Sequence, residues 1–207
     1  MKSYPEIPNS NGTKFQRISD AHVFDKLDGS NLRFEWNKKK GWSKFGTRNR
    51  LFDETDLDFG PAIKLFADTL ATPLEAIIAG ERWDRVIFFA EYWGVHSFAG
   101  KHLIGEPMDL TLFDAAPYKK GLIGPKEFLK LFPDKVPTPR YLGQCNWTRT
   151  VVDTVRKGEM SGVTFEGVVA KAGIGHGLIM TKAKTQAWID RIKETYAASE
   201  ANSLIYS

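Results

Sequence analysis

The order of strand-like and helix-like segments constrains the fold most strongly. Residues 32–36 alternate apolar with charged side chains, which predicts a half-buried strand, and residues 42–45 return from a lysine-rich turn as a hairpin. Residues 85–93 are apolar up to Glu91 and predict a buried strand. Further strands are predicted at 109–113, 163–171 and 178–184, and helices at 61–70, 72–80, 125–132, 148–157 and 185–198. This irregular order predicts an α+β domain built on antiparallel sheets.

Composition supports one globular domain over residues 1–207. Of the 207 residues, 42% are hydrophobic and 26% charged, which excludes a disordered or collagenous chain. We expect no membrane span and no secretory signal, because no run of 18 apolar residues and no apolar segment near the N-terminus exist. A single cysteine, Cys145, excludes an internal disulfide and favours a cytoplasmic location. The net charge of +4 permits a nucleic-acid partner.

Four short segments carry charged side chains beside or within predicted strands. Lys26–Gly29 precedes a strand, and Glu91 ends an apolar one. Glu166–Lys171 embeds two charges among β-branched residues, and Lys182 and Lys184 point to the same side of a strand. Taken singly, each segment permits a structural reading as a solvated turn, a strand end or a surface ion pair.

Strand periodicity makes a specific prediction about the third segment. A period of two places Glu166, Val168 and Ala170 on one face of the strand and Lys171 on the other. Buried glutamate and lysine are costly unless they are paired or functional.

Other polar residues carry weaker signals. The four histidines lack metal-ligand spacing and are expected in structural or surface roles. Cys145 is expected as a packed thiol. Lys38–Lys40 is expected as a solvated turn, with contact to a phosphate backbone as the alternative. The histidines are His22, His96, His102 and His176.

Together and in this order, the four segments resemble motifs of the covalent nucleotidyltransferase superfamily, which comprises polynucleotide ligases and mRNA capping enzymes. The resemblance covers roughly residues 20–185 and includes 109–114, which is similar to the motif that supplies a base-stacking aromatic. It implies two antiparallel β-sheets flanked by helices, the ATP-grasp-like adenylyltransferase domain of ligases and capping enzymes.

One position narrows the resemblance within the superfamily. DNA ligases and capping enzymes usually carry an arginine two residues after the glycine of the nucleophile motif, and this chain has Asn31. The asparagine resembles the ATP-dependent RNA ligase branch of phage RNA repair and RNA editing. That branch also carries a basic motif shortly after the lysine. Within residues 43–50 we select Arg48 for it over Lys44 and Arg50.

The resemblance implies a ligase that uses ATP and Mg²⁺ or Mn²⁺ to seal 3′-OH and 5′-phosphate ends of RNA through a lysyl-AMP intermediate. Nicked or broken RNA duplexes are the implied partners, with DNA or RNA/DNA hybrids also possible substrates. The alternatives are a minimal DNA ligase, an enzyme that adenylylates another 5′-phosphate end, and a non-catalytic module that binds nucleic-acid ends. ATP rather than GTP rests on the resemblance alone.

By the same resemblance, Lys26 is the nucleophile. Its amine must be neutral to attack, and neighbouring positive charge disfavours the ammonium form. Lys182 and Lys184 would supply that charge and stabilise the reacting phosphate. Glu91 would accept a hydrogen bond from a ribose hydroxyl, and Phe113 would stack on adenine.

The remaining roles are also implied by resemblance. Backbone groups of residues 25–27 would read the adenine edge, and Glu166 would place the metal, through water. Lys171 would contact the nucleotide phosphate, and Arg48 and Asn31 would hold the 5′-phosphate end or the phosphates of ATP. The implied nucleotide-binding set is Asp25, Lys26, Leu27, Asn31, Arg48, Glu91, Phe113, Glu166, Lys171, Lys182 and Lys184.

Only 23 residues follow Lys184. We expect them to form one closing helix and a tail, without the OB domain of DNA ligases or the helical C-terminal domain of many RNA ligases. In a minimal ligase of this kind, we expect substrate capture and sealing either to be weaker or to need a protein partner that supplies substrate binding.

Overall fold

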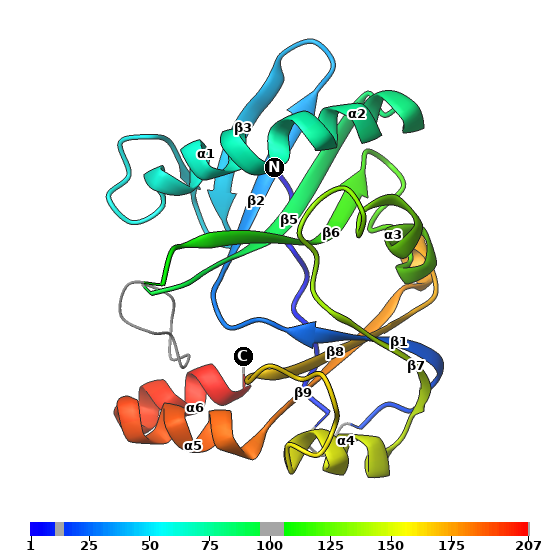
Figure 1. Cartoon of the computed structure of the whole chain (residues 1–207), viewed down its shortest axis with the longest axis vertical. Helices are drawn as coiled ribbons and strands as arrows, with labels where there is room; N and C mark the ends of the chain where they lie inside the picture. The colour runs from blue at the N-terminus through cyan, green and yellow to red at the C-terminus, as the bar shows by residue number, and fades with distance from the viewer. Residues whose placement is uncertain (11–14, 96–105, 207) are drawn as a thin grey trace.

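The computed structural model describes residues 1–10, 15–95 and 106–206, and two antiparallel sheets flanked by helices form its frame (Figure 1). The smaller sheet has the strand order β7-β1-β8-β9 and the larger one β4-β3-β2-β5-β6. The α+β prediction is therefore confirmed. The elements are β1 (Ile18–Lys26), β2 (Ser30–Asn37), β3 (Gly41–Thr47), β4 (Leu51–Phe52), α1 (Gly60–Phe66), η1 (Ala67–Ala71), α2 (Thr72–Glu81), β5 (Arg85–Trp93), β6 (Asp109–Pro117), α3 (Pro125–Leu131), β7 (Tyr141–Trp147), α4 (Arg149–Arg156), β8 (Gly167–Ala172), η2 (Gly175–Gly177), β9 (Ile179–Lys184), α5 (Gln186–Thr195) and α6 (Ala198–Tyr206).

Helices α1 and α2 cover one face of the larger sheet (Figure 1). Phe34 of β2 and Phe66 of α1 stack with ring centroids 4.2 Å apart, and Phe88 of β5 lies fully buried in the same cluster. Alternate strand residues supply this apolar face, and burying aromatic rings of this size dominates the stability of such a core.

Helix α4 packs on the smaller sheet in a second core. Trp147, Val155 and Val168 are fully buried there. The opposite face of this sheet looks toward the larger sheet and carries Lys26, Lys182 and further residues of the cavity described below.

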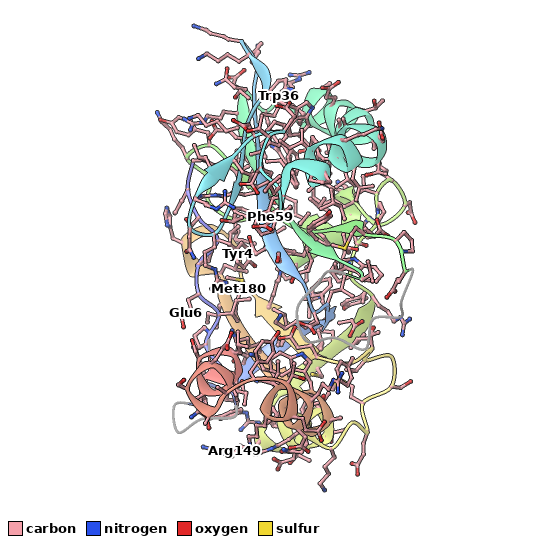
Figure 2. All side chains as sticks on the ribbon, turned by 90° about the vertical axis from the view of Figure 1, so that its left-hand side faces the viewer. Tyr4, Glu6, Trp36, Phe59, Arg149 and Met180 are labelled. Carbon is pink, nitrogen blue, oxygen red and sulfur yellow. The ribbon has the colours of Figure 1, made fainter. Side chains whose placement is uncertain are left out.

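The N-terminal segment, residues 1–10, runs from the larger sheet to the smaller one. Arg33 Nη1 donates to the Met1 carbonyl at 2.9 Å, and Asn9 forms a parallel bridge with Lys182. Figure 2 shows Tyr4 beside Met180, at the level between the sheets, and the Tyr4 hydroxyl lies 3.2 Å from the Met180 sulfur. Sequence patterning predicts no such docking.

Several predictions about secondary structure are wrong. The sequence pattern missed β1 and β7. β1 is an interior strand with both faces buried and β7 is a polar edge strand, so neither alternates apolar with polar residues. Residues 185–207 contain two helices instead of one helix and a tail, since Ala201 and Ile205 of α6 are buried with α5. The helices predicted at 61–70 and 72–80 are not separate, because a π-helical turn, η1, joins α1 to α2.

Among the described residues, no helix combines the length and apolar character needed to cross a membrane.

Candidate active site

A cavity of about 570 Å³ lies between the two sheets. Residues of β1, β8 and β9 line it from the smaller sheet, and Asn31 and Glu91 line it from the larger one. All eleven residues of the predicted nucleotide-binding set line this cavity: Asp25, Lys26, Leu27, Asn31, Arg48, Glu91, Phe113, Glu166, Lys171, Lys182 and Lys184. Residues as far apart in sequence as Asp25 and Lys184 therefore meet at one cavity.

Lys26 and Glu166 form an ion pair in the cavity. Lys26 Nζ donates to Glu166 Oε2 at 2.7 Å, and the two side chains are 22% and 5% exposed. Lys184 Nζ lies 3.8 Å from the other oxygen of the same carboxylate and donates to the Leu204 carbonyl at 2.6 Å. One buried carboxylate thus lies between two amines that the sequence predicts to be catalytic.

Gly167 explains why Glu166 points into the cavity. The periodicity prediction, which put Glu166 and Lys171 on opposite faces, is wrong, because both line the same cavity. The strand begins only at Gly167, whose φ of +151° breaks the alternation. A Cβ there would lie 2.0 Å from the Ala183 carbonyl oxygen, so only glycine fits.

The pKa of Lys26 is raised in this structure. Burial of the amine lowers it, but the charges of Glu166 and Glu91 outweigh burial. Burial and the neighbouring amines instead lower the pKa of Lys182, and burial also lowers that of Lys184, each to about 8. The predicted depression of the Lys26 pKa by nearby cations is therefore absent, because the charges of Glu166 and Glu91 raise this pKa by more than burial lowers it.

Glu91 lies near the end of β5, opposite Asn31 of β2. Burial, with the charges of Glu166 and Asp28, raises its pKa to about 7, against the opposing charge of Lys26. A carboxyl group that titrates near neutrality can accept or donate a hydrogen bond to a hydroxyl. The buried Oδ1 of Asn31 has no hydrogen-bond partner among the described residues, and its side chain lines the cavity.

The residues before the nucleophile are held by side-chain contacts. Asp25 accepts from the Thr164 N–H at 2.9 Å and from the Thr164 hydroxyl. The Asp25 N–H donates to the Arg140 carbonyl at 2.9 Å. The strand end that presents Lys26 is therefore fixed on both sides. That backbone groups of residues 25–27 read a base edge stays a prediction.

Phe113 and Lys171 lie together at another part of the cavity. Lys171 Nζ donates to the Phe113 carbonyl and to Asp114 Oδ2, each at 3.0 Å. In the strand ladder Lys171 is opposite His22, four residues from Lys26. This geometry places Lys171 beside the predicted base-stacking ring; its contact with a nucleotide phosphate stays a prediction.

Three basic residues were candidates for the motif after the lysine, and their surroundings differ. Arg48 lines the cavity. Lys44 is not among the lining residues and pairs with Glu35 at 3.4 Å. Arg50 lines the cavity but forms an ion pair with Asp56. Arg48 therefore stays the candidate for this motif, and its contact with phosphate stays a prediction.

The donor set fits a divalent cation held partly by substrate. The described residues contain no group of three or more histidine, cysteine, aspartate or glutamate side chains that could hold a metal ion alone. Mg²⁺ typically takes one or two carboxylates, with phosphate oxygens and water as its other ligands. Glu166, 5% exposed and facing the cavity, fits that pattern.

Sequence reasoning missed Tyr4, Asp114 and Thr164, which contact cavity residues through hydrogen bonds. Asp114 lies at the end of the motif-like segment 109–114 but has no predicted role, and no spacing pattern points to Tyr4 or Thr164. The expected structural roles of His22 and Cys145 agree with their places: His22 is buried against Tyr141, and Cys145 packs against the second core. Lys38–Lys40 forms an exposed turn, His176 lies in η2, and His96 and His102 lie outside the described residues.

No protein-family model matches the chain, and no curated protein matches it. Solved structures do. An RNA ligase of Naegleria gruberi superposes with a TM-score of 0.68 at 18% identity, over 93% of this chain and 58% of the ligase. An archaeal ATP-dependent RNA ligase superposes with a TM-score of 0.67 at 17% identity, over 91% of this chain and 50% of the ligase.

The chain has the fold of the matched part of these RNA ligases. Another structure of the Naegleria gruberi RNA ligase, with ATP and Mn, superposes with a TM-score of 0.67 at 16% identity. The chain spans between 50% and 58% of the length of these ligases.

Proposed function

We propose that this protein is an ATP-dependent RNA ligase that joins 3′-OH and 5′-phosphate ends through an AMP carried on Lys26. One observation carries the proposal: Lys26 lies in the cavity 2.7 Å from Glu166, with Lys182 and Lys184 lining the same cavity. The likeness to solved RNA ligases, one of them with ATP and Mn, supports it.

In the first step, the Lys26 amine attacks the α-phosphorus of ATP. A nitrogen–phosphorus bond forms, the bond to the β-phosphate oxygen breaks, and pyrophosphate leaves. The amine must lose its proton, and Glu166 Oε2 is the acceptor within hydrogen-bonding distance. Lys182 and Lys184 would stabilise the negative charge of the reacting phosphate.

Two cavity residues, Phe113 and Glu91, would bind different parts of ATP. Phe113 would stack on the base, and Glu91, near the end of β5, would bind a ribose hydroxyl. Holding the nucleotide at both ends keeps its α-phosphorus at the Lys26 amine, and such positioning can contribute several kcal/mol to catalysis.

A divalent cation would be held by Glu166, together with phosphate oxygens and water. When bound there, it would neutralise phosphate charge and compete with Lys26 for the Glu166 carboxylate, which lowers the pKa of the amine.

The later steps need an RNA end at the cavity. AMP passes from Lys26 to the 5′-phosphate, and the 3′-OH then attacks that phosphate and expels AMP. Arg48 and Asn31 would hold the 5′-phosphate, Arg48 by charge and Asn31 by its amide group.

The first step is tested with α-labelled ATP and Mg²⁺, followed by a denaturing gel. We expect label that survives denaturation in the wild type and none in Lys26→Ala or Lys26→Arg. Lys193→Ala, a change of a lysine on α5, is the matched control and should label as the wild type does. Label that persists in Lys26→Ala contradicts the proposal.

The substrate is tested with nicked duplexes in which each strand is RNA or DNA in turn. The proposal expects faster sealing when the strand that carries the nick is RNA. Sealing that is fastest on all-DNA nicks would identify a DNA ligase. Adenylylation of Lys26 without sealing of any nick would contradict the proposed ligase activity and support only its first step.

A further inference from the structure

The two ends of the N-terminal segment are each attached to a residue of the cavity wall. The Ser3 hydroxyl donates to the Arg48 carbonyl at 2.8 Å. At the other end of the segment, Lys182 donates its N–H to the Pro8 carbonyl at 2.9 Å, and the Ser10 N–H donates to the Lys182 carbonyl at 2.8 Å. The backbones of two predicted phosphate-binding residues are therefore held by the first ten residues.

Tyr4 makes the central contact of this segment. Its side chain lines the cavity, yet the residue is only 4% exposed. The hydroxyl donates to Asp114 Oδ2 at 2.9 Å, the same oxygen that accepts from Lys171 Nζ at 3.0 Å. The Tyr4 ring meets the Phe113 ring edge-to-face, with centroids 5.0 Å apart and an interplanar angle of 86°.

These contacts constrain both groups at the base end of the cavity. Edge-to-face packing restrains the plane of the Phe113 ring, on which a base would stack. The Tyr4 hydroxyl satisfies and orients the Asp114 carboxylate, which in turn holds the Lys171 ammonium beside the same ring. Burial and the Asp114 charge raise the pKa of Tyr4 well above its ordinary value, so the phenol keeps the proton that it donates.

We propose that the N-terminal segment forms the rear wall of the nucleotide cavity and that Tyr4 is a positioning residue that orients Phe113 and the Asp114–Lys171 pair for binding the base of ATP. The inference rests on the proposed function, since it takes the cavity as the ATP site. Tyr4 need not touch the nucleotide and acts through these neighbours.

The test separates ATP binding from the reaction. In a Lys26→Ala background, which cannot carry AMP, ATP affinity is measured by calorimetry with and without Tyr4→Phe. This substitution keeps the ring and removes the hydroxyl, and we expect the Kd for ATP to rise about fivefold, because the Asp114–Lys171 pair is then less ordered before ATP binds and must be fixed on binding. Tyr118→Phe, a change of an exposed tyrosine, should leave the Kd unchanged.

Steady-state kinetics in the Lys26 protein give a second readout. A positioning role predicts that Tyr4→Phe raises KM for ATP and leaves kcat within about twofold, and that it has no further effect on KM once Lys171→Met is present. An unchanged Kd and KM in Tyr4→Phe, or a loss of kcat and thermal stability at constant KM, overturns the inference. Failure of the proposed function would appear separately, as a wild type that binds ATP without forming labelled protein.

Discussion

The buried pair of Lys171 and Asp114 gives the sharpest prediction about stability. The two groups lie 3.0 Å apart, with side chains 9% and 2% exposed. Lys171→Met keeps most of the side-chain volume and leaves a buried carboxylate without its cation. Removing one partner of such a pair costs about 3–5 kcal/mol. Because Asp114 keeps hydrogen bonds from Tyr4 and Ala115, we expect the lower end, about 3 kcal/mol.

Urea and thermal unfolding measure this cost. A loss of about 3 kcal/mol in a domain of this size corresponds to a Tm decrease of roughly 6–12 °C. Lys64→Met, which removes one partner of the exposed pair with Asp68, is the matched control and should change the free energy of unfolding by less than about 0.5 kcal/mol. The double variant Lys171→Met/Asp114→Asn should regain at least half of the lost stability. A Lys171→Met protein as stable as the wild type would refute the reasoning.

Three further predictions concern other parts of the cavity and the sheet beside it. Arg48→Ala should slow AMP transfer to an RNA 5′-phosphate about tenfold or more while lysyl-AMP still forms, whereas Arg50→Ala should change that rate only a few-fold; equal rates in Arg48→Ala and wild type would contradict this. Burial raises the pKa of Glu35, but the hydrogen bond and charge of Arg85 outweigh burial and lower it. The Glu35 carboxylate therefore stabilises the fold above the unfolded-state pKa of about 4.3. This stabilisation is lost as the pH falls through the lower folded-state pKa. Urea unfolding should therefore show Glu35→Gln less stable than wild type at pH 7, with the gap closing below about pH 4; a constant gap would count against it. Gly167→Ala should cost about 3 kcal/mol in urea unfolding and abolish AMP labelling, because its Cβ would clash with the β9 backbone; full labelling would show that the backbone can adjust.

Residue patterns predicted the cavity better than they predicted the scaffold. The sheets follow from alternation in strands such as β2, but β1 lacks alternation because both of its faces are buried. Its end nevertheless carries Lys26, which the local motif identified without the strand. Motifs of charged residues are short segments that can be recognised in the sequence. The cavity residues could therefore be named before the structure showed that they line one cavity.

Contacts between distant segments account for what the sequence did not predict. Tyr4 reaches Asp114 across 110 residues, and nothing in the spacing of either residue indicates it. The orientation of Glu166 depends on the backbone of Gly167, which strand periodicity cannot supply. Likewise, the raised pKa of Lys26 follows from a 2.7 Å contact with Glu166, a distance that only the folded chain defines.

The claim on which the account rests is that the amine of Lys26 bonds to the phosphorus of AMP. Mass spectrometry after incubation with ATP and Mg²⁺, on intact protein and on its peptides, tests it most directly. We predict one added AMP per chain, on the peptide that contains Lys26, removed by acid as expected for a phosphoramidate and absent when EDTA is present. An unmodified chain, or AMP bound to another lysine, would contradict the account.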